Sequence, residues 1–402
     1  MSVLFGHPTG NPFAYNAALA HFEAARLEAF CIPWMPSSAS LRLLQLIRPL
    51  RKMVQRLTRR HFSGLADAPK VQGLPGESRR LLVRALGWGD DERMADAAND
   101  WLMRTMRREC RRPAVTAVHA YEDCSLWQFI EARRLGKACI YDMPIGYHAA
   151  WEDIRNRLAG KYSDWLPAGG SPPPRRNVQK REEMERADLV LAPSSFVVDT
   201  IHAFHPRKPV VLAPYGVDLA AWTPAPSRAP PEIMTFLFVG QCSIRKGTPL
   251  LLAAWRAAGL KNAGLRLVGH WNLAGSKKRQ LPPCCEWSGP LASAQLRAVY
   301  RDADVFVFPS NFEGRALVVC EALASGLPVL TTSASGVGDE VDGNCGRMLP
   351  AENLEALVEG LRWFDRNRHR LSDMRRAARK NAERCTWDAY RCRVTEAVAP
   401  FV

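Results

Sequence analysis

Short apolar segments of strand length alternate with helical segments through the whole of this 402-residue chain. Eight segments have the length and the apolar side chains of buried strands, and they cover residues 3–6, 114–120, 138–141, 189–192, 234–240, 265–269, 305–309 and 328–331. Helical patterns lie among them at residues 14–30, 125–135, 180–187, 249–258, 292–302 and 317–325. This alternation predicts an α/β fold in which parallel strands are joined by crossover helices.

Two proline-rich stretches interrupt the alternation. Residues 168–176 read AGGSPPPRR, and residues 222–232 read WTPAPSRAPPE directly before a new strand segment. Because 402 residues exceed one ordinary domain, we place a domain boundary at the second stretch. Each half is then expected to form a doubly wound sheet. Ligands of such sheets bind beyond the carboxyl ends of the strands, so the expected site is a cleft between the two domains.

The net charge indicates which binding partners suit the protein, and the cysteine content indicates its cellular compartment. The net charge of +15 suits nucleic acid, an anionic membrane surface or a phosphorylated small molecule. Eleven cysteines without any Cys-x-x-Cys spacing favour free thiols in a reducing cytosol over disulfides or a zinc site. No apolar run reaches the ~20 residues of a membrane span, and the N-terminus does not resemble a signal peptide. A cytoplasmic protein is therefore expected.

The segment from Leu41 to Arg60 combines apolar residues at helical spacing with seven basic residues and no acidic one. Pro49 would kink or divide such a helix. The pattern is typical of a helix on an anionic membrane surface or of a clamp for an anionic acceptor. An ordinary surface helix with a solvated basic face fits it equally well, and both interpretations stay open. The basic residues between Arg104 and Arg112 could extend the patch.

A pair of glutamates carries the strongest chemical signal. Glu313 follows a predicted strand, and Glu321 lies eight positions later within an apolar helical segment. Eight positions are a little over two helical turns, so both carboxylates can address one ligand from one side. A carboxylate in apolar surroundings costs free energy unless it binds something. The alternative is a pair of surface glutamates on an amphipathic helix, which does not explain the apolar neighbours of Glu321.

This run resembles the Glu-x7-Glu motif of the family 4 glycosyltransferases, and the resemblance covers most of residues 185–390. Further matching segments are residues 193–196, 214–218, 238–247, 267–269, 287–289 with Leu296 and Tyr300, and 385–387. The resemblance implies the GT-B fold, in which two Rossmann-like domains face a cleft. Residues 1–216 would form the acceptor-side domain and residues 217–384 the nucleotide-sugar-binding domain. Residues 385–402 would form a helix that returns to the N-terminal domain.

The resemblance also implies roles for the donor-side residues. Arg245 and Lys246, in a loop before a helix, would hold the diphosphate that leaves during transfer. Glu321 would accept hydrogen bonds from the donor ribose, and Glu313 would contact the donor sugar or stabilise positive charge near it. Many relatives carry an arginine where this chain has Gln241. The remaining residues predicted to bind the donor in this domain are Gly314, Arg315, Ala316 and Leu317.

On the N-terminal side, Gly10 and Asn11 follow the first predicted strand and match the loop that approaches the donor pyrophosphate in relatives. Glycine permits close approach of the backbone to a ligand. His119 ends another strand and is the candidate for direct catalysis, although a packing role is also open because Tyr121 stands where relatives carry a second histidine. Residues 142–148 are expected to contact the acceptor.

The resemblance implies a retaining hexosyltransferase that uses a nucleotide-diphosphate sugar. Its acceptor would be a glycan or lipid-linked intermediate of polysaccharide biosynthesis at the cytoplasmic membrane face. The resemblance implies that no metal or other cofactor is needed, and the sequence agrees because Asp123 and Asp142 are isolated and no DxD-like cluster is present. One alternative is an epimerase-like sugar-nucleotide enzyme of the same fold. Another is a basic nucleic-acid-binding protein, but the chain has no recognised module for it, so nucleic acid is not an expected partner.

Overall fold

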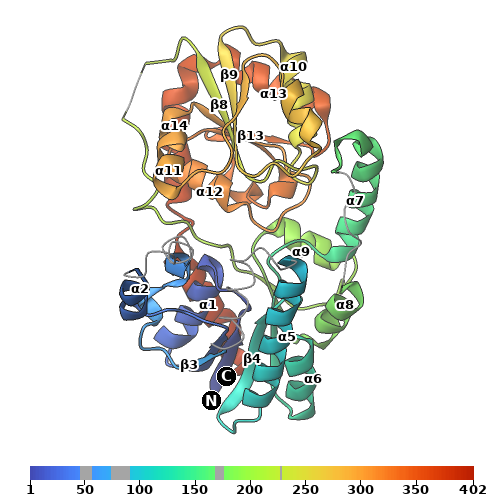
Figure 1. Ribbon diagram of the computed structural model, residues 1–402, viewed down its shortest axis with the longest axis vertical. Helices are drawn as coiled ribbons and strands as arrows, with labels where there is room; N and C mark the ends of the chain where they lie inside the picture. Colours follow the sequence, from blue (N-terminus) through green and yellow to red (C-terminus); the bar gives the residue numbers. More distant parts are fainter. Residues whose placement is uncertain (46–56, 74–90, 168–175, 227–228) are drawn as a thin grey trace.

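The computed structural model describes residues 1–45, 57–73, 91–167, 176–226 and 229–402. Two parallel sheets, each covered by helices, lie one above the other in Figure 1. Both chain termini lie at the lower, N-terminal sheet. The predicted α/β class with parallel sheets is confirmed.

The N-terminal sheet has seven strands in the order β3-β2-β1-β4-β5-β6-β7, and every neighbouring pair is parallel. The strands are β1 (Ser2–Gly6), β2 (Leu27–Ile32), β3 (Lys70–Gln72), β4 (Val115–Tyr121), β5 (Ala138–Asp142), β6 (Leu189–Ala192) and β7 (Val210–Leu212). The helices of this part are α1 (Pro12–Glu23), α2 (Ser38–Gln45), α5 (Asp91–Glu109), α6 (Leu126–Arg134), α7 (His148–Lys161), α8 (Asn177–Arg186) and α9 (Ser195–His202).

The C-terminal sheet has six parallel strands in the order β10-β9-β8-β11-β12-β13. They are β8 (Met234–Val239), β9 (Ala263–Val268), β10 (Cys285–Trp287), β11 (Val305–Phe308), β12 (Val329–Thr332) and β13 (Gly346–Leu349). The helices are α10 (Thr248–Ala258), α11 (Ser293–Asp302), α12 (Leu317–Ala324), α13 (Leu354–Arg366), α14 (Leu371–Ala382) and α15 (Trp387–Val398). In both sheets the strand order reverses beside the first strand, which is the place where doubly wound sheets bind ligands.

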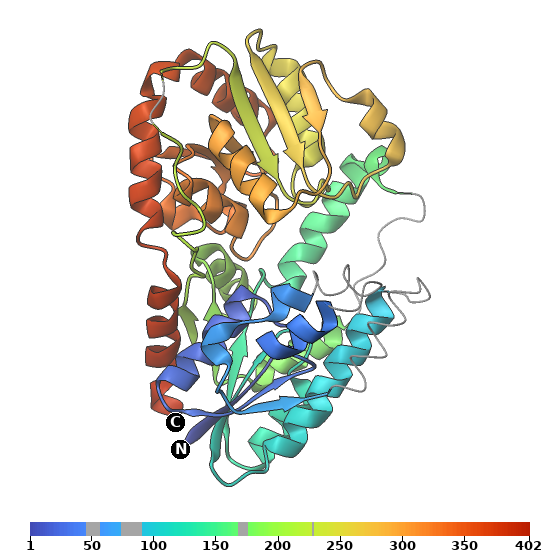
Figure 2. The same ribbon diagram turned by 60° about the vertical axis from the view of Figure 1, so that its left-hand side comes forward.

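The chain passes between the two layers more than once. After β7 it runs up into β8, and after α14 it returns, so that α15 lies along α1 of the N-terminal part (Figure 2). Thr386 caps α15 by accepting a hydrogen bond from Ala389 N, and Tyr390, Val394 and Val398 join the N-terminal core. Helix α7 reaches upward from the N-terminal side toward the C-terminal sheet.

One predicted helix was wrong in its extent. The pattern over residues 14–30 predicted a single helix, whereas α1 ends at Glu23 and β2 begins at Leu27. Ala25 adopts a left-handed conformation with φ of 52°, which ends the helix. The following apolar residues then pair with β1 and β3 in the sheet interior, where tertiary packing overrides local helical propensity.

Most of the basic segment from Leu41 to Arg60 lies outside the described residues. Its described parts are the end of α2 and the residues from Leu57 onward, which include a short 3₁₀ turn at Thr58–Arg60. The predicted membrane-surface helix therefore stays a prediction. Within the described ranges, none of the helices has the combination of length and apolar sequence that a membrane crossing requires.

Candidate active site

The loop after β8 brings two cations to the edge of the C-terminal sheet that faces the other domain. Arg245 and Lys246 precede Gly247, which has a left-handed backbone conformation with φ of 72°. This residue ends the loop and is the N-cap of α10. A side chain at Gly247 would meet Pro309 O at 1.9 Å, so the loop is held tightly against the end of β11. Glycine is therefore required at position 247 both for its backbone conformation and because a larger side chain would not fit.

Glu313 lies between these two cations. One of its carboxylate oxygens is 3.1 Å from a guanidinium nitrogen of Arg245, and the same oxygen pairs with Lys246 Nζ. Ser310 Oγ donates a third hydrogen bond to it at 2.9 Å. Glu313 as a residue is only 7% exposed, so the pairing occurs away from bulk water. Two cations sharing one carboxylate retain positive charge for an incoming anion, and burial lowers the pKa of Lys246.

Glu321 belongs to a separate group of contacts on α12. Burial raises its pKa to about 7, well above the usual range of a carboxyl group. The Tyr300 hydroxyl, from α11, lies 3.2 Å from Glu321 Oε2 and 3.1 Å from Val318 O. Hydroxyl groups that donate hydrogen bonds to a buried carboxyl group stabilise its ionised form.

The residues that follow Glu313 connect the two domains. A side chain at Gly314 would lie 1.8 Å from Pro144 O, so the backbones are in direct contact there. Ser194 Oγ donates to Gly314 O at 2.5 Å, and Gly146 N donates to Glu313 O at 3.3 Å. The loop is thus fixed against the turn between β5 and α7.

Arg315 and Ala316 form hydrogen bonds with protein groups, and Nη2 of Arg315 is buried without a hydrogen-bond partner among the described residues. The Arg315 guanidinium is buried, donates to Tyr215 O at 3.0 Å and pairs with Glu340 at 3.0 Å. Ala316 N donates to Ser335 O at 2.9 Å. Leu317 is the first residue of α12. The structure therefore places Arg315 in an interdomain contact and does not bring it to Arg245 and Lys246.

Gly10 and Asn11 form a preorganised turn at the end of β1. Gly10 has φ of 70°, and a side chain there would meet the Tyr15 hydroxyl at 2.3 Å. Asn11 caps α1, with its Oδ1 accepting a hydrogen bond from Ala14 N at 2.9 Å. His7, which sequence reasoning missed, accepts a hydrogen bond from Gly10 N at 2.8 Å. Burial lowers the pKa of His7 to about 3, so the ring is a neutral acceptor that shapes the turn.

The structure does not support direct catalysis by His119. Its side chain is fully buried between the sheet and α1, with Nδ1 2.9 Å from His21 Nε2. The edge-on ring of Phe5 lies at a centroid distance of 4.9 Å. A catalytic group must touch the substrate, and His119 is enclosed by core residues. The packing role that was left open is the one that the geometry favours.

A cavity of about 830 Å³ lies between the domains. The C-terminal side contributes Gln241, Ser243, Ile244, Arg245, Asn272 and Phe312, and the N-terminal side contributes residues of the turn before α7, of α7 and of α8. Among the latter is His148, the last residue of the segment 142–148 that was expected to contact the acceptor. Trp151, Glu152 and Arg155 also line the cavity, and sequence reasoning missed them because α7 was not predicted. The one available signal was the position of residues 142–148 at the end of a strand.

Comparison with known proteins agrees with this geometry. Residues 224–384 match the family model described as glycosyl transferases group 1. One relative is WcaL of Escherichia coli K12, which is named as a putative colanic acid biosynthesis glycosyltransferase. It is 27% identical over 216 residues, which cover 49% of this chain and 53% of that protein. A D-inositol 3-phosphate glycosyltransferase of Kineococcus radiotolerans is 28% identical over 262 residues, or 56% of this chain and 60% of that one. The chain thus spans little more than half the length of these curated relatives.

Solved structures match over the whole chain. Sucrose-phosphate synthase of Thermosynechococcus elongatus has a TM-score of 0.65 at 14% identity, covering 100% of this chain and 98% of that one. HepE of Anabaena, in complex with UDP and glucose, has a TM-score of 0.61 at 14% identity with 100% of both chains covered. The predicted GT-B fold and the resemblance to glycosyltransferases are confirmed.

Proposed function

We propose that this chain is a glycosyltransferase that moves a sugar from a nucleotide-diphosphate sugar to an acceptor with retention at the anomeric carbon. The match of residues 224–384 to the glycosyl transferases group 1 model supports the proposal. The observation that carries the proposal is the convergence of Arg245 and Lys246 on Glu313 at the interdomain edge of the sheet. Breaking the bond between sugar and diphosphate leaves the electron pair on a phosphate oxygen. Positive side chains in a partly buried site stabilise that charge.

In this proposal the remaining residues divide the work. Glu313 lies beside the cations, where its carboxylate can face the positive charge that develops on the anomeric carbon. Glu321 accepts hydrogen bonds from the ribose. Burial raises its pKa, so hydroxyl donors such as Tyr300 and the ribose are needed to stabilise its ionised form. Gly10 and the backbone of its turn approach the pyrophosphate from the other domain. The protein cations supply the charge that the leaving diphosphate needs, and in the described ranges no three His, Cys, Asp or Glu side chains form a metal-binding group.

Structural neighbours suggest the donor. HepE is solved with UDP-glucose at a TM-score of 0.63, which supports a UDP-linked hexose as the first donor to try. The name of WcaL supports an acceptor from polysaccharide biosynthesis. We infer that the protein works at the cytoplasmic face of the membrane, where the basic segment from Leu41 to Arg60 would meet anionic lipid.

Thermal unfolding with nucleotides tests the proposal directly. One of UDP, GDP and ADP is expected to stabilise the protein, because a ligand at 100 times its Kd adds about 2.7 kcal/mol. For domains of this size that corresponds to roughly 5–10 °C in melting temperature. Hydrolysis or transfer of the matching nucleotide sugar, followed by mass spectrometry, then identifies the donor and separates transfer from epimerisation.

The alternative, a basic nucleic-acid-binding protein, predicts a different result in the same measurements. If no nucleoside diphosphate shifts the unfolding temperature, and the protein instead binds DNA tightly at physiological salt, the chain is a basic nucleic-acid-binding protein and the transferase proposal fails. Retention of DNA binding only at low salt would indicate nonspecific attraction by the net charge of +15.

Donor affinity is also expected to depend on pH through Glu321. With a pKa of about 7, its carboxyl group is mostly protonated at pH 6 and mostly ionised at pH 8. Because ribose hydroxyls bind the ionised form more strongly, affinity for UDP-glucose should rise about tenfold between these values and level off above them. The esterified diphosphate of this ligand does not titrate in that range. Glu321→Gln should abolish the dependence, and the exposed control Glu355→Gln should preserve it.

A further inference from the structure

The main chain around Glu313 is bound by the N-terminal domain, although Glu313 belongs to the C-terminal one. Gly146 N donates a hydrogen bond to Glu313 O at 3.3 Å, and Ser194 Oγ donates one to Gly314 O at 2.5 Å. The carboxylate of Glu313 is bound by three side chains of its own domain, which are Arg245, Lys246 and Ser310. One domain therefore fixes the backbone of this residue, and the other fixes its side chain.

Ser194 makes its contact from the end of the N-terminal sheet. It lies between β6 and α9, is 1% exposed and caps α9, with its Oγ accepting a hydrogen bond from Val197 N at 3.3 Å. Serine is a preferred N-cap because its oxygen takes up a backbone N–H of the first helical turn. A hydroxyl can accept and donate at the same time, so this side chain both closes the helix end and holds the carbonyl of Gly314.

The carbonyl that Ser194 binds lies in a narrow space. A side chain at Gly336 would lie 2.0 Å from Gly314 O and 2.9 Å from Ser194 Oγ, and a side chain at Gly314 would lie 1.8 Å from Pro144 O. The loop is thus enclosed between Gly336 of its own domain and Pro144 of the other. Because a buried carbonyl without a partner costs free energy, the peptide group should keep the orientation in which Ser194 reaches it.

The turn that contains Gly146 is bound at both of its ends. Met143 N donates to Leu191 O of β6, and Tyr147 N donates to the Thr200 hydroxyl of α9, each at 3.0 Å. Ser194 lies between these same two elements. The two donors that hold the backbone at Glu313 and Gly314 therefore belong to one connected surface of the N-terminal domain.

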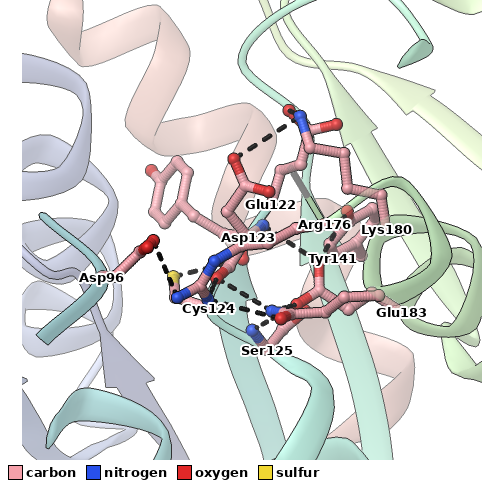
Figure 3. A network of polar contacts seen from close by, with 11 residues as sticks. Asp96, Glu122, Asp123, Cys124, Ser125, Tyr141, Arg176, Lys180 and Glu183 are labelled. Atoms are coloured by element: carbon pink, nitrogen blue, oxygen red, sulfur yellow. Dashed lines mark hydrogen bonds and ion pairs between the residues drawn. The ribbon is translucent and has the colours of Figure 1, made fainter. Parts of the chain in front are cut away.

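A buried carboxylate supports this surface from behind. The Tyr141 hydroxyl of β5 donates to Glu183 at 3.0 Å, and the same carboxylate accepts hydrogen bonds from Asp123 N at 3.0 Å and Ser125 N at 2.9 Å (Figure 3). Glu183 lies on α8 and is fully buried. The network joins α8 and the turn after β4 to β5, the strand that leads into the turn with Gly146, so that turn has a firm base.

We propose, building on the transferase function above, that Ser194 is a positioning residue for Glu313. Its hydroxyl sets the peptide group that follows Glu313 and thereby orients the carboxylate toward the anomeric carbon of the donor. Sugar transfer then depends on this contact between the domains. Binding of the nucleotide alone depends on Arg245, Lys246 and Glu321 and does not require it.

The kinetics of Ser194→Ala test this role. The variant should lower kcat for hydrolysis or transfer of the nucleotide sugar about 10- to 100-fold, since a misplacement of ~1 Å at a reacting centre can cost about 10²-fold. Its affinity for UDP should change by less than about twofold. Ser194→Thr keeps a hydroxyl that can cap α9 and bind Gly314 O, and it should keep kcat within about fivefold of the unchanged protein.

Asn353→Ala is the matched control for the loss of a helix cap. Asn353 caps α13, with its Oδ1 accepting a hydrogen bond from Ala356 N at 2.8 Å, so this variant loses a cap and keeps the contact between Ser194 and Gly314. Both alanine variants should lower the melting temperature by roughly 2–4 °C. Only Ser194→Ala should lower kcat.

Hydrogen–deuterium exchange adds a measurement that needs no turnover. Exchange in peptides that cover residues 311–316 should quicken at least about fivefold in Ser194→Ala, because the loop loses a bond that holds it, and should stay unchanged in Asn353→Ala. If exchange responds in this way and the unchanged protein transfers no sugar, the interdomain contact stands and the transferase proposal fails.

Four kinetic results would overturn the role of Ser194. One is a kcat of Ser194→Ala within about threefold of the unchanged protein. Another is an equal loss of kcat in Asn353→Ala, which would assign the effect to helix capping. A parallel loss of UDP affinity in Ser194→Ala would assign it to a general loosening of the fold. A loss of kcat in Ser194→Thr equal to that in Ser194→Ala would show that the size of this side chain matters and its hydroxyl does not.

Discussion

Replacing Lys246 with methionine is expected to lower kcat/KM for the nucleotide sugar by about 10²- to 10³-fold, the effect of removing one preorganised charge donor from a reacting centre. Methionine keeps the length of the side chain and removes its charge. The Lys246 ammonium is partly buried and shares Glu313 with Arg245. Its loss leaves Glu313 paired to Arg245, so the fold should survive while these side chains lose the net positive charge that faces the leaving diphosphate. Steady-state kinetics on the purified variant measures the effect.

Two comparisons make this prediction specific. Lys261→Met removes an exposed lysine of the same domain and should leave kcat/KM unchanged. UDP affinity should fall with kcat/KM in Lys246→Met, because the diphosphate is present both in the bound donor and in the transition state. A variant that keeps its UDP affinity and loses less than threefold in kcat/KM would show that Lys246 serves only to hold Glu313 in place.

The convergence of the cationic loop with Glu313 could be predicted because the topology requires it. Arg245 follows β8 and Glu313 follows β11, and these strands are neighbours in a parallel sheet. The carboxyl ends of parallel strands meet at one edge, so residues 68 positions apart in sequence come within 3.1 Å. The alternation of strands and helices contained the information needed for this inference.

Other parts of the site depend on packing that a single sequence does not display. His119 and Tyr121 are two positions apart on β4 and lie on the same face of the sheet, with stacked rings 6.1 Å apart, but tertiary contacts decide that α1 covers this face. Arg315 follows Glu313 closely in sequence, yet its guanidinium reaches the interdomain turn at Tyr215. The hydrophobic pattern of α7 is weak because the helix borders the cavity and has few buried positions, so Trp151 could not be identified. His148 was predicted only as part of the segment 142–148.

Arg315→Met is expected to destabilise the protein by about 3–5 kcal/mol, the usual result of breaking a buried ion pair from one side. The guanidinium joins the domains by donating to Tyr215 O at 3.0 Å and by pairing with Glu340 at 3.0 Å. Its side chain is 1% exposed and that of Glu340 is 11% exposed. Removal of the cation leaves a carboxylate and a carbonyl in surroundings that cannot hydrate them well. Urea denaturation followed by circular dichroism measures the loss.

The double variant Arg315→Met/Glu340→Gln separates charge from packing. If the main cost of the single change is the unpaired Glu340 carboxylate, removing that charge should restore a large part of the lost stability. A double variant as unstable as the single one would assign the cost to the lost hydrogen bond with Tyr215 O instead. Arg376→Met, which breaks an exposed ion pair with Asp373 on α14, should change stability by less than about 1 kcal/mol. Because Arg315 links the turn between the sheets to the C-terminal domain, its loss should also broaden the unfolding transition, as two domains that have lost a contact unfold less cooperatively.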